Sequence, residues 1–237
     1  MILIKNGRLV DPLSKRDEVV DIVIEKDKIK EIGKNLNQDG FEYIIDATGC
    51  VVAPGLIDIH VHFRDPGFTY KEDIFSGAKA AAKGGFTTVV CMANTKPVVD
   101  NKETLKYILD KGKESDINVL QVSTVTKGLK GKELVDFDEM FKAGAVGFSD
   151  DGIPIKHTKL VYEAMKKAKE LNVPISLHEE NPVFIKKAGV NDGKVSKELG
   201  LEGGATSLAE NIMVSRDVMI ALETGAKVNI QHISSKE

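Results

Sequence analysis

Strand-like and helix-like segments alternate along most of this 237-residue chain, and this alternation is the strongest constraint on its fold. Apolar and β-branched runs bounded by turn residues predict strands, and longer segments rich in Ala, Lys and Leu predict helices. Strands that alternate with helices pair in parallel, because each helix carries the chain back to the starting edge of the sheet. The expected strands are residues 56–63, 86–94, 117–125, 145–152, 173–180 and 226–235, and the expected helices are 70–83, 102–113, 133–143, 158–171 and 207–224, with a further helical start after residue 181.

This pattern predicts an α/β fold of a particular kind. About six strand–helix units in roughly 180 residues fit a partial (β/α)₈ TIM barrel, about six of eight units, better than a doubly wound sheet. A dinucleotide-binding fold has no support, because no Gly-x-Gly-x-x-Gly motif follows any expected strand.

A different pattern precedes the alternation. Residues 1–11, 19–33 and 41–55 are β-branched runs separated by Asn-Gly, Lys-Asp and Thr-Gly turn signals. They predict a small and mostly antiparallel β module that ends at Pro54-Gly55. We therefore expect two domains, the β module over residues 1–53 and an incomplete barrel over residues 54–237.

The composition excludes several function classes. The formal net charge is −3 and acids are mixed with bases, so nothing indicates binding to nucleic acid or to an anionic membrane. No apolar run approaches the roughly 18 residues of a membrane span, and the first residues become charged too early for a signal peptide. The two cysteines, Cys50 and Cys91, lie in apolar runs and are expected to be buried free thiols, which favours the cytoplasm.

The segment GLIDIHVHFRDPG, residues 55–67, carries two histidines at the end of the first expected barrel strand. Successive side chains of a strand point to opposite faces, so His60 and His62 lie on one face, about 7 Å apart along the strand. Two imidazoles in this arrangement can bind one metal ion from one side. The alternative is a polar strand face that carries two histidines and no metal.

Other polar groups follow the later strands. Asp150 and Asp151 end the fourth expected strand, His178 the fifth and His232 the sixth. Active sites of barrels are built at the carboxyl ends of the strands, so this shared placement predicts one site. The remaining histidine, His157, precedes a helix and is expected to be a cap or a surface residue.

A count of ligands separates one metal ion from two. Four histidines and a carboxylate exceed the three protein ligands of a typical catalytic zinc. They suit two ions ~3.5–4 Å apart that share an oxygen bridge. Zinc is the default metal for imidazole-rich sites, with manganese, iron and cobalt as alternatives. Strand alternation does not choose between Asp150 and Asp151 as the bridging carboxylate.

Taken together, these motifs resemble those of the amidohydrolase superfamily and, within it, of the bacterial long-chain (type I) dihydroorotases. IDIHVHFRDPG is similar to the metal-binding motif, and MANTKPVVD at 92–100 to the Asn-Thr-x-Pro segment. GFSDDG at 147–152, LHEE at 177–180 and QHISS at 231–235 match in order and spacing. The resemblance covers the whole chain. It implies a distorted (β/α)₈ barrel with a small β-sandwich domain, and a zinc-dependent cyclic amidohydrolase that reversibly cyclises N-carbamoyl-L-aspartate to L-dihydroorotate in de novo pyrimidine biosynthesis.

The resemblance also implies roles for individual residues. Two zinc ions bridged by Asp151 and a hydroxide are expected, with Asp150 as the fallback bridge. The expected metal ligands are His60, His62, Asp151, His178 and His232.

For the substrate, the resemblance implies binding by His62, Arg64 and Asn94. The planar guanidinium of Arg64 suits a carboxylate, and an ion pair with Asp65 or Glu72 is the alternative. The nearby polar residues are expected to form structural hydrogen bonds only; they are Thr95, Lys96 and Glu180.

Two other functions remain open. Hydantoinases and allantoinases are close relatives of the dihydroorotases, but their bridging ligand is a carbamylated lysine on strand four. The segment AVGFSDDG contains no lysine, since Lys142 precedes it and Lys156 follows it, which favours an aspartate bridge. The second alternative is a non-catalytic dihydroorotase-like subunit that supports a transcarbamoylase.

We expect the chain to be the N-terminal part of a longer enzyme. In the family that it resembles, an aspartate at the end of strand eight binds metal and acts as the general base. No residue here matches that aspartate, so the base is expected beyond Glu237, and the 237-residue chain alone is expected to be inactive. The full-length parent is expected to be a cytoplasmic homodimer, with aspartate transcarbamoylase as a candidate partner.

Overall fold

A computed structural model describes residues 1–186 and 189–237, which form two compact units. The first unit comprises Met1–Leu56 and the second Ile57–Glu237. Cys91 is buried as expected. The expectation that Cys50 is buried is wrong, because this residue lies in the exposed turn before a two-residue strand.

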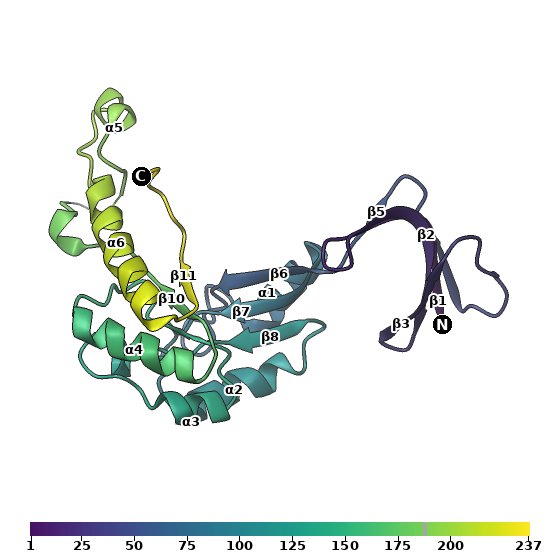
Figure 1. Cartoon of the computed structure of the whole chain (residues 1–237), viewed down its shortest axis with the longest axis horizontal. Coiled ribbons are helices and arrows are strands. Elements are labelled where there is room, and N and C mark those ends of the chain that lie inside the picture. Colours follow the sequence, from purple (N-terminus) through teal and green to yellow (C-terminus); the bar gives the residue numbers. More distant parts are fainter. Residues whose placement is uncertain (187–188) are drawn as a thin grey trace. The chain divides into compact units, whose positions relative to one another are not determined.

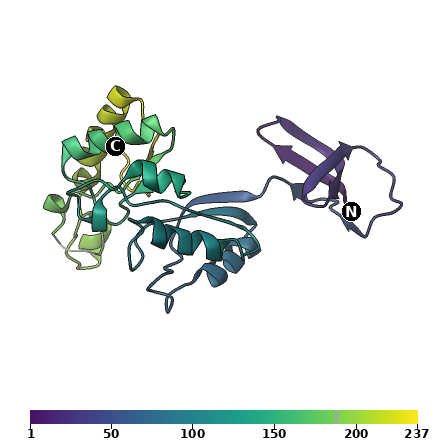
Figure 2. The ribbon, with the colours of Figure 1, turned by 90° about the horizontal axis from the view of Figure 1, so that it is seen from below.

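The first unit is a single mixed sheet, drawn in purple and blue in Figure 2. Its strands β3, β2, β1 and β4 lie in that order, and β5 also pairs with β1. The β1–β2 and β2–β3 pairings are antiparallel, whereas β4 and β5 run parallel to β1. The bounds are β1 Ile2–Asp11, β2 Arg16–Glu25, β3 Lys28–Gly33, β4 Tyr43–Asp46 and β5 Val51–Val52.

The second unit contains six strands that neighbour one another in chain order. One sheet has the order β6-β7-β8 and another the order β9-β10-β11. Backbone bonds from Ser123 to Gly147 and from Ser149 to Ser123, at 3.0 and 2.8 Å, join the two sheets. Parallel pairing is confirmed for β7–β8, β9–β10 and β10–β11. The bounds are β6 Leu56–Val61, β7 Phe86–Cys91, β8 Asn118–Gln121, β9 Phe148–Ser149, β10 Ile175–Leu177 and β11 Val228–Ile230.

Helices α1 to α4 start where a side chain caps them, whereas no side-chain hydrogen bond caps the start of α6. Asp73 accepts a hydrogen bond from the backbone of Ser76, so α1 begins four residues later than the sequence predicts. Asn101, Asp136 and His157 cap the next three helices in the same way, which confirms the cap predicted for His157. The bounds are α1 Ile74–Lys83, α2 Lys102–Gly112, α3 Phe137–Lys142, α4 Thr158–Glu170 and α6 Ser207–Thr224.

The connection after β10 is more structured than expected. The predicted helical start is the short 3₁₀ turn Pro182–Phe184. A further short helix, α5 Lys194–Glu198, was not predicted. A second 3₁₀ turn, Lys127–Leu129, follows β8.

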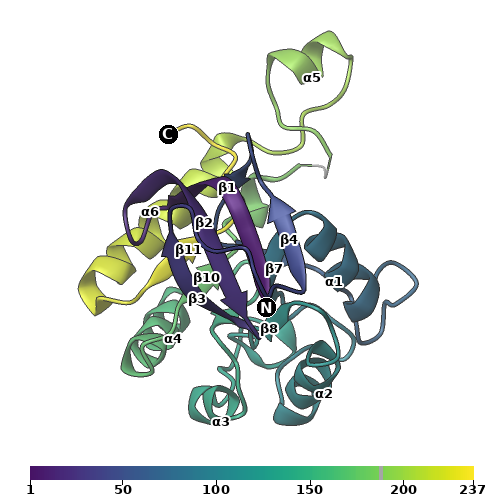
Figure 3. The same ribbon diagram turned by 90° about the vertical axis from the view of Figure 1, so that its right-hand side faces the viewer.

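The helices surround the strands and close one apolar core. Figure 3 shows α1, α2, α3, α4 and α6 in an arc outside β7, β8, β10 and β11. Phe148 on β9 stacks on Phe137 of α3 at a centroid distance of 3.8 Å, and neither ring is exposed. This packing holds the strand ends in register, which positions the polar groups that follow them.

Among the residues that the structure describes, none of the helices combines the length and hydrophobicity needed to cross a membrane.

Candidate metal centre

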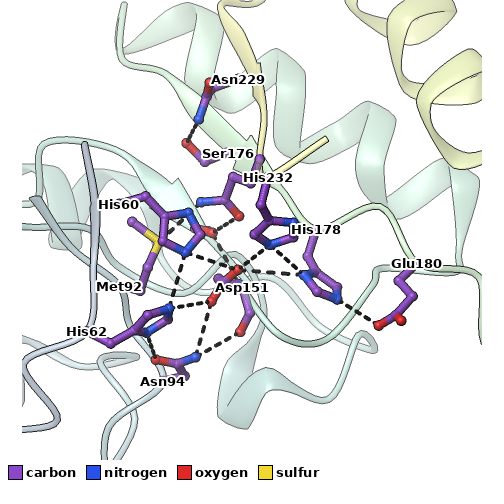
Figure 4. A network of polar contacts seen from close by, with 12 residues as sticks. His60, His62, Met92, Asn94, Asp151, Ser176, His178, Glu180, Asn229 and His232 are labelled. Atoms are coloured by element: carbon purple, nitrogen blue, oxygen red, sulfur yellow. Dashed lines mark hydrogen bonds and ion pairs between the residues drawn. The ribbon is translucent and has the colours of Figure 1, made fainter. Parts of the chain in front are cut away.

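Five side chains, drawn in Figure 4, meet at the carboxyl ends of four strands of the second unit, whose ribbons Figure 1 labels as β6, β10 and β11 together with the shorter β9. His60 lies near the end of β6, and each of the others lies one or two residues beyond its strand, where the chain turns. This is the position at which parallel strands bring residues distant in sequence to one edge. The five residues are His60, His62, Asp151, His178 and His232.

His60 and His62 form one half of the cluster. Their Nε2 atoms are 3.2 Å apart. Nε2 of His60 lies 3.6 Å from Oδ1 of Asp151, and Nε2 of His62 lies 3.4 Å from Oδ2. The two ring nitrogens and the carboxylate of Asp151 therefore face one small volume.

His178 and His232 form the other half. Nδ1 of His178 lies 3.0 Å from Nε2 of His232. These two nitrogens lie 3.6 and 3.2 Å from Oδ1 of Asp151. In each half the three candidate ligand atoms lie within 4.8 Å of one another, and Asp151 belongs to both halves.

The electrostatics of the cluster follow from one buried carboxylate among four imidazoles. Burial of Asp151 would raise its pKa, but the four neighbouring imidazoles together outweigh it, so the pKa lies well below its ordinary value. The proximity of the Asp151 carboxylate raises the pKa of His178. Burial lowers the pKa of His60.

The donor set fits divalent metal ions. Imidazole nitrogens and a carboxylate are ligands of zinc and of related transition metals. Two unprotonated ring nitrogens 3.2 Å apart repel each other unless a proton or a cation lies between them. Each half supplies two nitrogens and one oxygen, so the geometry can hold one cation per half.

Two further side chains orient the histidines. Nδ1 of His62 contacts Oδ1 of Asn94 at 3.0 Å, which leaves Nε2 directed at Asp151. Nδ2 of Asn94 donates to the backbone oxygen and to Oδ2 of Asp151, both at 3.3 Å. Nε2 of His178 contacts Oε2 of Glu180 at 3.1 Å, so its Nδ1 faces the cluster. In metal sites, the ring nitrogen of a ligating histidine that does not face the metal commonly forms such a hydrogen bond, which orients the imidazole.

Asp150, the fallback bridge, lies outside the cluster. Its Oδ1 accepts hydrogen bonds from the backbone of Val125 and Thr126 at 2.7 and 3.1 Å, and the hydroxyl of Thr126 donates to Oδ2. These bonds fix the segment after β8. Burial raises the pKa of Asp150 to about 6. Both lysines near this strand, Lys142 and Lys156, are exposed and belong to neither half of the cluster.

Arg64 is half-buried and lies two residues beyond His62. The alternative ion pair with Asp65 does not form, because Tyr107 and Lys111 occupy both oxygens of that carboxylate. Glu72 instead accepts hydrogen bonds from Ser76 and from the backbone of Asp73. Within the described residues, Arg64 forms no ion pair.

The polar residues expected to be structural differ in their contacts. The hydroxyl of Thr95 donates to the backbone oxygen of Pro97 at 2.7 Å, as a structural hydrogen bond would. The side chain of Lys96 is exposed. Glu180 lies beside a hollow of about 370 Å³ that His178 and His232 also line, which gives this half of the cluster access to solvent.

Comparison with known families gives a match over most of the chain. The family model described as dihydro-orotase-like matches residues 49–237. A dihydroorotase of Clostridioides difficile is 63% identical over 235 residues, which cover 99% of this chain and 56% of that protein. A dihydroorotase of Clostridium acetobutylicum is 56% identical, over 100% of this chain and 55% of that protein. The chain thus spans about 55% of the length of the curated relatives that it matches.

Solved structures show the same fold at lower identity. An L-hydantoinase (dihydropyrimidinase) from Arthrobacter aurescens superimposes with a TM-score of 0.77 and 22% identity, over 98% of this chain and 53% of that one. A D-hydantoinase gives a TM-score of 0.75 and 25% identity, over 98% of this chain and 52% of that one. The chain therefore shares the mixed α/β fold of these two structures.

Proposed function

Because this chain belongs to the dihydro-orotase-like family, we propose that it is part of a dihydroorotase, a metal-dependent cyclic amidohydrolase. The reaction is the reversible cyclisation of N-carbamoyl-L-aspartate to L-dihydroorotate. The observation that carries this proposal is the convergence of four histidines on the single carboxylate of Asp151. The identity to two named dihydroorotases supports the substrate class.

The proposed cofactor is a pair of zinc ions. His60, His62 and Asp151 would hold one ion, and Asp151, His178 and His232 would hold the other, with the Asp151 carboxylate shared between them. Bound divalent cations would supply a water of lowered pKa and polarise the ring amide of the substrate. The ring orientations set by Asn94 and Glu180 keep Nε2 of His62 and Nδ1 of His178 directed at that volume.

Arg64 is proposed to bind the substrate carboxylate, together with Asn94 and His62. A guanidinium offers two parallel donors to a carboxylate, and Arg64 has no ion-pair partner in the described part of the chain. Asn94 touches both His62 and Asp151, so it links the carboxylate-binding groups with the metal ligands. The general base is proposed to come from the part of the relatives that this chain does not cover.

The fold proposed for the whole protein is a (β/α)₈ barrel with a small β-sandwich domain. The parallel strands β6 to β11 in chain order support about six of the eight barrel units. Residues 1–53 would contribute to the sandwich. A cytoplasmic homodimer that associates with aspartate transcarbamoylase is part of the same proposal.

A hydantoinase or allantoinase is the alternative, and one residue weighs against it. Those enzymes use a carbamylated lysine where Asp151 lies at the centre of the histidines. The likeness to solved hydantoinases rests on 22–25% identity and supports the fold. The convergence of four histidines and one aspartate on a small volume weighs against a non-catalytic subunit, because such a subunit is expected to have lost ligands.

The test is an assay of the full-length protein that carries this chain. We expect ring closure of N-carbamoyl-L-aspartate with about two equivalents of zinc, and little activity on hydantoin or allantoin. His178→Ala should lose metal and activity, whereas His157→Ala, which removes an exposed histidine that caps α4, should keep both. Equal losses in the two variants, or a metal-loaded wild-type protein that turns over only hydantoin, would reject the proposal.

A further inference from the structure

Asp65 is a buried carboxylate held by two side chains of one helix. Only 2% of the residue is exposed. Tyr107 donates to its Oδ1 at 3.0 Å, and Lys111 donates to its Oδ2 at 2.7 Å. Lys111 also donates to the hydroxyl of Tyr107, one turn earlier on α2, at 3.0 Å. We refer to Asp65, Tyr107 and Lys111 as the Asp65 anchor.

The anchor fixes the turn that carries Arg64. The backbone oxygen of Arg64 accepts a hydrogen bond from Phe68 at 2.9 Å, which closes residues 64–68 into a turn. On its other side, the backbone oxygen of Pro66 accepts from Lys96 at 3.0 Å. The turn is thus held between α2 and the segment after β7, which carries Asn94.

Arg64 itself depends on this turn. Its φ of +59° lies in the left-handed region, which residues other than glycine seldom adopt without support from their surroundings. No ion pair within the described residues holds the guanidinium, so the backbone is what sets the point and direction from which the side chain starts. That backbone is fixed at the next residue by the anchor.

We propose that Tyr107 and Lys111, acting through Asp65, are positioning residues that direct Arg64 toward the carboxylate of the substrate. This inference rests on the proposed function, in which Arg64 binds that carboxylate. Neither residue belongs to the cluster of candidate metal ligands, so their effect should fall on substrate binding and leave the metal content unchanged.

The test uses the full-length protein and steady-state kinetics with N-carbamoyl-L-aspartate. Lys111→Met should raise KM roughly tenfold with kcat within about threefold, as expected when binding shared by ground and transition states is lost. Lys111→Arg, which keeps the cation, should recover most of the wild-type KM. Lys106→Met is the matched control, because Lys106 is an exposed lysine of the same helix that pairs with Asp110.

A double-mutant cycle shows whether the effect passes through Arg64. Arg64→Ala alone should raise KM, and adding Lys111→Met to it should raise KM no further, because the residue to be positioned is gone. A full tenfold increase in the Arg64→Ala background would overturn the proposal and leave Lys111 with a role of its own.

Lys111→Met leaves a buried carboxylate without its cation and could therefore unfold the protein. Tyr107→Phe removes one hydroxyl and keeps the ion pair, so it should fold and raise KM by about threefold. If Lys111→Met and Tyr107→Phe both fold and both keep the wild-type KM, the inference is overturned. A wild-type protein without dihydroorotase activity would instead reject the proposed function, and an active one in which only Arg64→Ala raises KM would reject this inference alone.

Discussion

At the scale of single residues, the adjacent aspartates Asp150 and Asp151 have opposite surroundings. Asp151 faces four imidazoles that lower its pKa, whereas Asp150 accepts hydrogen bonds from two backbone amides. The ionised carboxylate of Asp151 can therefore bind a cation, whereas the carboxylate of Asp150 stabilises the segment after β8.

This difference predicts distinct effects of the same substitution. Asp151→Asn should lose most of the bound metal and retain the fold, because an amide has the carboxylate's shape without its charge. Asp150→Asn should keep the metal and lower the free energy of unfolding by about 1–3 kcal/mol, since hydrogen bonds to a charged acceptor are weakened. Metal analysis and thermal unfolding of both variants test this. Greater metal loss from Asp150→Asn would contradict the assignment.

The two cysteines should differ in reactivity. Burial raises the pKa of Cys91 to about 12, so at pH 8 its thiol stays protonated and unreactive. Cys50 is exposed. Iodoacetamide labelling with peptide mapping should therefore modify Cys50 well before Cys91, and urea should make the two rates similar. Equal rates in the native protein would show that β7 opens readily.

The sequence predicts the positions of the clustered histidines better than the contacts of Asp65 with Tyr107 and Lys111. A histidine at a strand end is visible in the pattern, because parallel strands share one edge. Tyr107 and Lys111 were missed because a tyrosine and a lysine on a helix look like an ordinary solvated face. Their contact with Asp65 depends on how α2 packs, which no local pattern encodes.

At the scale of elements, two loops after neighbouring strands lock together. Gly67 has a φ of +93°, and a Cβ added there would lie 2.1 Å from the backbone oxygen of Lys96. Gly85, at the end of α1, has a similar φ of +85° but open space around it. A comparison of substitutions at Gly67 and Gly85 therefore separates the free-energy cost of backbone strain from that of a steric clash.

Gly67→Ala should therefore destabilise the protein more than Gly85→Ala. Gly85→Ala costs only the free energy of placing alanine in the left-handed conformation, about 1–2 kcal/mol. Gly67→Ala must in addition displace the loop that carries Asn94. Denaturant unfolding of both variants measures the difference. Equal free energies of unfolding would mean that the two loops are not rigidly coupled.

The bounds of the elements were predictable where a strong end signal exists. The predicted bounds of α6 agree with the structure, because Gly225 adopts the left-handed cap at φ +66° that stops the helix. The start of α1 was placed too early, since Asp73 is one of several polar residues that could have capped it. β9 is only two residues long because Asp150 turns away to bond the segment after β8.

At the scale of the whole molecule, large apolar side chains remain in contact with water. Ile57 and Ile59 on β6 are 63% and 52% exposed, and Met219 and Leu222 on α6 are 65% and 73% exposed. Burying such a side chain is worth roughly 1.5–3 kcal/mol, so these surfaces favour association.

We therefore expect the polypeptide 1–237, produced alone, to self-associate. Because the general base is proposed to come from the part of the relatives that these residues do not cover, we also expect this polypeptide to lack dihydroorotase activity. Light scattering over a range of concentrations measures the association, and Met219→Gln with Leu222→Gln should reduce it. The exposed and polar Lys79→Gln on α1 is the control. A monomer at every concentration that closes the ring of N-carbamoyl-L-aspartate would contradict both expectations.

The wide spacing of the clustered residues sets an order in time during synthesis. Asp151 and His232 are 81 residues apart in the chain. At ~5–20 residues per second, a ribosome adds His232 roughly 4–16 s after Asp151. Until β11 has been made and has docked, a nascent chain can offer only the half-site of His60, His62 and Asp151. The two halves of the candidate site can therefore come together only after this region has been translated, whereas His60, His62 and Asp151 can meet earlier.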